Sequence, residues 1–319
     1  MRIDPAIAAL RRDRALQRRA QARMAAACDA WRAAPGVHEV LAAFERYGQG
    51  APLADCPALQ AVFTDRETAP RVVAALTGEF CCALGEEPFG HPPLRHGYDR
   101  GTATLLLARR GRAQFVLHAS EPDARRFDTV TFSDAERFEA VLAGEARGRT
   151  VRRKGRFGRF AEQPLVLGAG ARLEFDMREE APQVLAIDRR LVALRLHRTA
   201  PNPAPTREYD LATGALLRQS AGGIRMSRHE IMLALLGRMR RADAAPVMAA
   251  IACEPGDASL RWQALRECLA LDTGAGFAAL RDLAHTEGDP LAAQARALQA
   301  RLVEAHPVLR TFEAASCLA

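Results

Sequence analysis

The spacing of apolar residues changes twice along this chain of 319 residues. Apolar positions recur with a helical period in the first third, alternate with polar positions in the middle third, and return to a helical period in the last third. The fold class that this pattern predicts is α+β, an antiparallel β-roll or sandwich flanked by helices. Its expected parts are a helical N-terminal region (1–100), the β region (101–222) and a C-terminal helical region (223–319).

The N-terminal region contains three predicted helices. Residues 5–33 carry an apolar stripe on one face and arginines on the other. A second helix is expected over 37–47. Thr64-Asp-Arg-Glu67 matches a capping box, in which the hydroxyl and the glutamate satisfy free backbone amides, so a third helix is expected from there to Gly85.

The middle third predicts short strands joined by tight turns, one of them at Asp188-Arg-Arg190. A second capping box, Ser133-Asp-Ala-Glu136, predicts a short helix over 134–143 inside this region. Closely spaced strands indicate an antiparallel arrangement, and the lack of alternating strands and helices excludes a doubly wound sheet. The expected strands are 102–109, 113–119, 127–132, 149–153, 164–168, 171–176, 183–188, 191–198, 206–210 and 215–219.

The last third contains a repeated helical pattern. Ser227-Arg-His-Glu230 matches a third capping box, and Ala-Leu pairs recur at Ala234, Ala264 and Ala297, which lie 30 and 33 residues apart. Over about 80 residues this stretch resembles HEAT-like repeats, a resemblance that implies stacked pairs of antiparallel helices and carries no activity. The expected helices are 228–241, 244–253, 258–271, 274–284 and 290–304.

The segment 164–198 resembles the central strands of a cupin-type β-roll. It carries a glycine-containing hairpin, an acidic loop and the sequence LAIDRRLVALRL. Metal-binding cupins place a glutamate after a His-x-His pair. This chain has no His-x-His, and neither Glu174 nor Glu179 has a histidine beside it. The resemblance therefore implies a β-roll without the usual metal centre.

Composition adds little to this picture. The net charge is +7, with 45 basic against 38 acidic residues, and Lys154 is the single lysine. This skew indicates a GC-rich bacterial genome rather than a role for arginine as such. The seven cysteines match no zinc or redox motif, so we expect buried thiols acting as small hydrophobes in a reducing cytoplasm. No apolar run is long enough for a membrane span or a signal peptide core.

A group of polar residues precedes the first predicted strand, and two further histidines end later strands. Together these residues can form a ligand or metal site, or an acid–base site, at the mouth of the β-roll. The alternative is a set of unrelated histidines, solvated or bonded to backbone. The candidate ligand or metal residues are His91, His96, Asp99, His118 and His197. No metal and no catalytic residue is assigned, and no nucleotide-binding or nucleophile motif is present, so the cofactor is unknown.

A basic run with interleaved glycines and phenylalanines connects two predicted strands. It suits phosphate contact with base stacking, or an acidic peptide or protein. It is also compatible with a solvated connection whose phenylalanines pack inward. The candidate partner- or phosphate-binding residues are Arg147, Arg149, Arg152, Arg153, Lys154, Arg156 and Arg159.

Three functions remain open from the sequence. The first is a non-catalytic accessory protein that binds a peptide or protein partner through the β-roll and the helical array. The second is an enzyme of oxygenase or isomerase type, with a metal or ligand site at the β-roll mouth. The third is a nucleic-acid-binding protein that uses the basic run; no membrane partner is expected. The content of the β-roll interior separates these hypotheses, since a packed apolar interior indicates a scaffold and a cavity lined by histidine or arginine indicates a ligand site.

Overall fold

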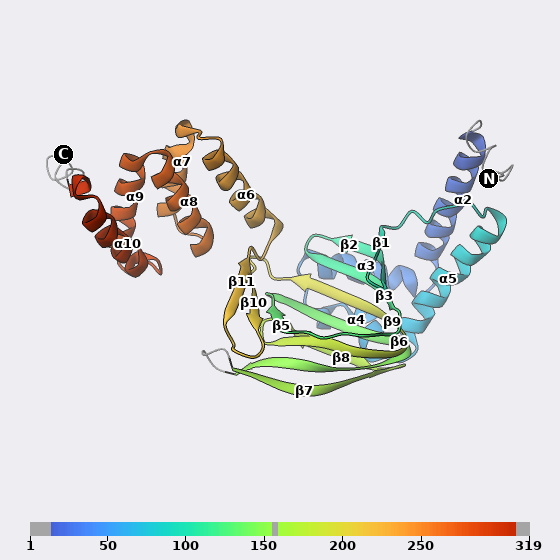
Figure 1. Ribbon diagram of the computed structural model, residues 1–319. Helices are drawn as coiled ribbons and strands as arrows, with labels where there is room; N and C mark the ends of the chain where they lie inside the picture. Colours follow the sequence, from blue (N-terminus) through green and yellow to red (C-terminus); the bar gives the residue numbers. More distant parts are fainter. Residues whose placement is uncertain (1–13, 155–158, 311–319) are drawn as a thin grey trace, which may run out of the picture. The chain divides into compact units, whose positions relative to one another are not determined.

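The computed structural model describes residues 14–154 and 159–310. The chain divides into two compact units, 1–219 and 220–319, and each is described by itself. The first unit joins N-terminal helices to an antiparallel β region and the second is helical, which confirms the α+β class (Figure 1). Within the described residues no helix is long and apolar enough to cross a membrane.

The N-terminal helices cover one face of the main sheet and share its core. Phe115 of the sheet lies between Phe44 and Phe63, with ring centroids 6.2 and 6.3 Å away. The Trp31 indole donates a hydrogen bond to the carbonyl of Val72 at 3.2 Å, which satisfies the polar atom of a fully buried ring. The helices are α2 (Arg14–Ala33), α3 (Val37–Gln49), the 3-10 turn η1 (Leu53–Asp55), α4 (Pro57–Thr64) and α5 (Thr68–Glu86).

The β region consists of an eight-stranded antiparallel sheet and a three-stranded sheet. The order of the first is β1-β2-β3-β9-β6-β7, with β4 paired to β9 and β8 paired to β6, and the order of the second is β11-β10-β5. The strands of the first are β1 (His96–Asp99), β2 (Thr102–Arg110), β3 (Ala113–Ser120), β4 (Asp123–Ala124), β6 (Ala135–Lys154), β7 (Arg159–Gly168), β8 (Arg172–Asp176) and β9 (Glu180–Thr199). The strands of the second are β5 (Thr129–Phe132), β10 (Thr206–Asp210) and β11 (Leu216–Ser220).

Two sequence predictions in this region are wrong. The expected helix 134–143 is the first half of β6, and the expected turn Asp188–Arg190 lies inside β9. The backbone of β6 pairs on both sides, with β9 and with β8, so ladder hydrogen bonds override the local capping pattern. Irregular pairing around residues 141–148 lets both strands continue. Gly144 has φ +94°, and an added Cβ would lie 2.1 Å from the carbonyl oxygen of Arg190, so only glycine fits this approach.

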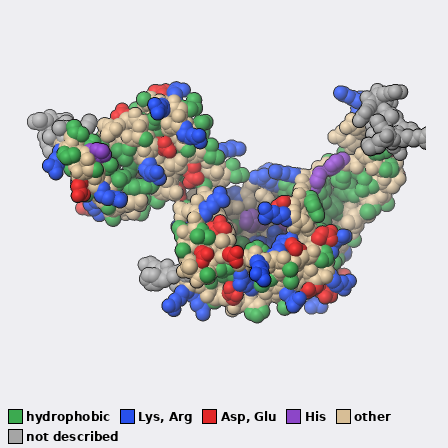
Figure 2. Space-filling view, viewed as in Figure 1, with side chains coloured by type: hydrophobic (Ala, Val, Ile, Leu, Met, Phe, Trp, Pro, Cys, Tyr) green, Lys and Arg blue, Asp and Glu red, His purple; other side chains and the backbone are tan. Residues whose placement is uncertain are grey.

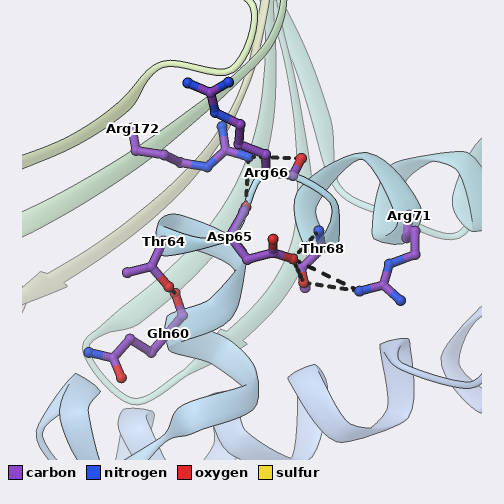
Figure 3. Close-up of polar contacts among 7 residues, drawn as sticks. All are labelled: Gln60, Thr64, Asp65, Arg66, Thr68, Arg71 and Arg172. Carbon is purple, nitrogen blue, oxygen red and sulfur yellow. Dashed lines mark hydrogen bonds and ion pairs between the residues drawn. The ribbon is translucent and has the colours of Figure 1, made fainter.

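The capping boxes at Thr64 and Ser227 are also wrong. The Thr64 hydroxyl donates to the carbonyl of Gln60 at the end of α4, and α5 begins only at Thr68. The Asp65 carboxylate accepts from the Thr68 amide at 3.0 Å and from its hydroxyl at 2.6 Å (Figure 3). Ser227 lies within α6, which begins three residues earlier. The Asp65 side chain therefore takes the role expected of Thr64, whereas α6 begins after Gly223 without a side-chain cap.

Arg172 ties the loop between α4 and α5 to the sheet. It extends from β8 and donates to the backbone carbonyls of Asp65 at 3.0 Å and Arg66 at 3.4 Å (Figure 3). These bonds satisfy carbonyls that no helix uses, since the loop lies between two helices.

The second unit has its own apolar core. Met248, Leu265, Phe277 and Leu280 are nearly inaccessible to solvent within it. Its helices match the predicted ones to within a few residues, whereas their stacking as HEAT-like repeats stays a prediction. They are α6 (Ile224–Arg238), η2 (Ala242–Ala244), α7 (Ala245–Cys253), α8 (Ala258–Leu271), α9 (Thr273–His285), α10 (Ala292–Ala305) and η3 (Pro307–Leu309).

The cysteines differ in part from the expectation of buried thiols. Cys28, Cys56 and Cys268 are buried, and Cys317 lies outside the described residues. In contrast, Cys81, Cys82 and Cys253 are exposed. Phe80 and Ala83 carry the buried stripe of α5, and adjacent helical positions point about 100° away from a stripe.

Candidate functional site

The face of the main sheet opposite the helices carries a group of charged and imidazole side chains. Strand register places Arg195 beside Glu139 and His197 beside Arg137, and His118 is the partner of Ala193 two residues before Arg195. Because side chains two residues apart on a strand share a face, these groups gather on one surface. We call His118, Arg137, Glu139, Arg195 and His197 the polar cluster. Figure 2 shows a hollow over β3 and β9, with histidine at its floor and charged side chains at its rim.

Glu139 is the centre of the polar cluster. Its side chain is 7% exposed, and one carboxylate oxygen, Oε1, accepts from the Nε atoms of Arg137 and Arg195, each at 2.5 Å. A further guanidinium nitrogen of Arg137 also donates to this oxygen. On its other side Arg137 lies over the Phe175 ring, 5.9 Å from the centroid. The carboxylate is therefore shared between two arginines, one of which also packs on an aromatic ring.

Glu139 and Arg137 stay charged at neutral pH. Burial alone would raise the pKa of Glu139, but the guanidiniums of Arg195 and Arg137 outweigh it and hold that pKa below its ordinary value. Burial lowers the pKa of Arg137 to about 10, and Arg195 acts in the same direction. Two cations and one anion leave the group with a single positive charge.

The two histidines of the polar cluster are neutral. Burial lowers the pKa of His118 to about 3, and the guanidinium of Arg195 adds to this effect. Burial also lowers the pKa of His197, with Arg137 the next cause. A neutral imidazole offers one hydrogen-bond donor and one acceptor. Beyond Glu139, the next residue on the same face of β6 is Val141, which belongs to an apolar cluster with Leu167 and Ile187. A buried apolar cluster therefore adjoins the polar cluster along β6.

The five histidine and aspartate candidates from the sequence do not meet in one place. His118 and His197 lie in the polar cluster, on adjacent strands. His91 and His96 instead lie against each other, 4.7 Å between ring centroids, and each Nδ1 contacts a nearby backbone carbonyl. Asp99 ends the exposed strand β1. Among the described residues no group of three or more His, Cys, Asp or Glu side chains is arranged to hold a metal ion.

Sequence reasoning missed Arg137, Glu139 and Arg195. A usable signal was present, because Arg137-Phe-Glu139 and Arg195-Leu-His197 alternate polar and apolar residues with a period of two. The first of these triplets lies in the segment predicted as a helix. The error in secondary structure therefore concealed half of the site.

Much of the basic run is paired within the protein. Arg147 forms two bonds to Asp188 at 3.1 Å, Arg149 donates to Glu162 at 2.8 Å, and Arg152 pairs with Glu180. Arg153 lies 5.9 and 5.7 Å from the ring centroids of Phe132 and Tyr209. Lys154 and Arg159 face each other as the last pair of the β6–β7 ladder, and Arg156 lies outside the described residues. A role in phosphate or partner contact stays a prediction.

Comparison with known proteins gives no functional assignment. No protein-family model matches the chain, and no curated protein is similar to it. Among solved structures it is similar to the 7S globulin of Momordica charantia (14% identity, TM-score 0.27), over 37% of this chain and 35% of the globulin, so it spans only about a third of that protein. It is also similar to the CENP-C cupin domain of Drosophila melanogaster (18% identity, TM-score 0.27, over 34% of this chain and 76% of that domain). A third match is a cupin superfamily protein of Desulfitobacterium hafniense (13% identity, TM-score 0.24, over 33% and 83%). Matches this weak carry no argument about activity, so the site must be judged from its own chemistry.

Proposed function

We propose that the β region of this protein binds a small anionic ligand on the face that carries the polar cluster. The observation that supports this proposal is the charge of the group: two arginines share one buried carboxylate, which leaves one positive charge without a counter-charge. Removing an unpaired charge from water is costly, so a partly buried excess cation is favourable only where an anion can meet it.

Arg195 has the free donors that such an anion requires. Its Nε atom donates to Glu139, and its side chain is 29% exposed. Within residues 14–154 and 159–310, no protein group accepts a hydrogen bond from its two Nη atoms. A guanidinium that presents two free N–H groups in one plane matches the two oxygens of a carboxylate. The neutral imidazoles of His118 and His197 are available for the uncharged polar groups of the same ligand.

The test uses the full chain and four defined probes: acetate, succinate, citrate and inorganic phosphate. Binding is followed by calorimetry and by thermal unfolding, with sodium chloride at equal ionic strength as the reference. We expect saturable binding of at least one carboxylate, and about tenfold weaker binding by Arg195→Gln, since the free fork is removed.

The matched control is Arg147→Gln. Arg147 lies on β6, but its charge is already balanced by Asp188 at the surface. This variant is expected to bind the probe as the unmodified chain does. Absence of saturation with all four probes, or equal affinity of the Arg195→Gln variant, would contradict the proposal.

A second candidate function, the binding of a protein partner, is favoured by the surface of α6. Its side chains Ile231, Met232 and Leu235, with Met239 just beyond the helix, are between 50% and 64% exposed. Apolar side chains at this spacing form a stripe of the kind that interacts with other proteins. A HEAT-like stack would add an extended binding face. Pull-down from the native host, compared with Leu235→Glu, tests this function: a partner lost with the variant supports it, and recovery of none contradicts it.

A further inference from the structure

A second polar cavity lies on the opposite face of the main sheet from the polar cluster. It has a volume of about 420 Å³, within the range of small-molecule sites. The residue after α3, the turn before β3, strands β6 and β8, and the end of β9 all contribute to its wall. Seven of its lining side chains are charged, four acidic and three basic, so the cavity carries a net charge of −1.

Two of the three arginines in this cavity are paired within the protein, and Arg198 is the first of them. Arg198 pairs with Glu136, donates to the carbonyls of Tyr47 and Ala51 at 2.8 and 2.6 Å, and lies 3.8 Å above the Tyr47 ring. The Tyr47 hydroxyl donates to Glu136 at 2.8 Å, which holds the same carboxylate from the helix side. This group is a rigid floor for the cavity, since each member is fixed by at least two others.

Arg178 is the second paired arginine, and it lies near two carboxylates. Arg178 donates to both carboxylate oxygens of Asp176, at 2.9 and 2.8 Å. Asp134 accepts from the backbone amide of Ala204 at 3.0 Å and lies 4.0 Å from Arg178. One cation thus faces two carboxylates here, which accounts for the net charge of −1. Within the described residues, two charged groups of the lining remain without an ion pair and are available to a ligand.

Arg112 and Glu174 are those groups. Arg112 donates to the carbonyl of Thr199 but has no carboxylate within ion-pair distance in the described part of the chain. Glu174 is exposed and, in the same residues, forms no ion pair. The cavity thus presents one unbalanced cation and one unbalanced anion to solvent.

Strand register separates these two charges. Arg112 immediately precedes β3, where Ala113 pairs with Arg198, and Arg198 pairs with Glu136. Glu136 pairs in turn with Asp176 on β8, the strand that carries Glu174. The backbone of the cation is therefore about three strand spacings, roughly 14 Å, from that of the anion. Their side chains take up part of this span and leave room for a molecule of a few carbon atoms.

We propose that this cavity binds a small amino acid-like molecule. Its carboxylate lies on Arg112, and the ammonium at its far end lies on Glu174. The net negative charge of the lining favours a ligand with a second ammonium, as in a basic amino acid, over a simple zwitterion. The site is distinct from the anion site proposed above, because Glu136 and Arg198 alternate with Arg137 and His197 along β6 and β9 and so face the other side of the sheet. Phe175 lines this cavity and also contacts Arg137 of the polar cluster.

Three probes of matched length test the assignment by calorimetry with the full chain. L-Lysine has all three charges, L-norleucine lacks the terminal ammonium, and cadaverine lacks the carboxylate. We expect L-lysine to bind about tenfold more tightly than either of the others. In Arg112→Gln the preference over cadaverine should disappear, and in Glu174→Gln the preference over norleucine should disappear.

Arg109→Gln and Glu254→Gln are the matched controls, because both residues are exposed and lie outside the cavity. Both variants are expected to bind L-lysine as the unmodified chain does. Equal binding of cadaverine and L-lysine, no binding of any probe at millimolar concentration, or unchanged L-lysine affinity in Arg112→Gln would overturn the proposal. Succinate binding at the polar cluster is measured in the same samples, so failure of one site is distinguished from failure of the other.

Discussion

The two units of this protein each bury an ionic group, and the groups differ in balance. In the second unit Arg261 pairs with Asp289, and the two side chains are 4% and 10% exposed. Arg261 also donates to the carbonyl of Ala252 at 3.0 Å, so one cation and one anion satisfy each other. In the first unit Glu139 serves two arginines, and one positive charge remains. A balanced pair holds a fold together, whereas an unbalanced group also leaves chemistry for a ligand.

Removing one member of the balanced pair should have the largest effect on stability. Arg261→Met leaves the Asp289 carboxylate buried without its cation, at a cost of about 3–5 kcal/mol in the unfolding free energy. Hydrogen exchange resolved by segment measures this loss within residues 220–319. The double variant Arg261→Met/Asp289→Leu should recover most of it, because no charge is then stranded. Equal destabilisation by the single and double variants would show that packing dominates instead.

Removing the shared carboxylate of the unbalanced group should have the next largest effect. Glu139→Gln leaves two neighbouring guanidiniums without an anion, and we expect a loss of about 2–4 kcal/mol, measured by hydrogen exchange over β6 and β9. Glu145→Gln is the control on the same strand, since its pair with Arg189 is exposed and should contribute less than about 1 kcal/mol. Similar losses for both variants would contradict the central role of Glu139.

The pH dependence of stability sharpens the comparison, because only the unbalanced group contains histidines. The pKa of His118 falls from 6.5 in the unfolded chain to about 3 in the folded one. Between these values the unfolded chain binds the additional proton, so the unfolding free energy should fall as the pH drops from 6.5 toward 3. His118→Asn should reduce the slope in this window for residues 1–219. An unchanged slope would show that His118 is protonated in the folded state.

Correcting the imbalance should have the smallest effect on stability. Arg195→Gln converts the group into a single pair of Arg137 and Glu139, so we expect a change of less than about 1 kcal/mol in the unfolding free energy. The same variant is expected to lose anion binding. A destabilisation as large as that of Glu139→Gln would indicate that Arg195 is required for folding and not kept for a ligand.

The sequence predicted elements well where local signals and tertiary structure agree. The hairpin of β2 and β3 follows from two alternating runs around Gly111, and α8 and α9 follow from apolar periodicity. The prediction from sequence failed at 134–143, where a capping motif favoured a helix and pairing with β8 and β9 imposed a strand. Local propensity cannot show which strand a segment will meet.

The same limit explains what was predicted of the site. His118 and His197 were found because histidine is chemically conspicuous. Arg195 and Glu139 were not, since arginine and glutamate are common and these two become partners only through the register of β9 on β6, 56 residues apart. The cavity around Arg112 depends on three such registers and on the end of α3. No sequence pattern within one segment contains that information.

The length of β6 and β9 has a consequence for protein engineering. The first half of β6 pairs with β8 and the end of β9, and its second half pairs with β7 and the start of β9, so each long strand belongs to both parts of the roll. The roll therefore cannot be split into two separately folding sheets. The turn between β7 and β8 is bonded to β6 as well, since the Gly170 amide donates to the carbonyl of Val141 at 2.9 Å and the Val141 amide donates to the carbonyl of Ala171 at 2.9 Å. A break near Gly144 would divide both parts at once.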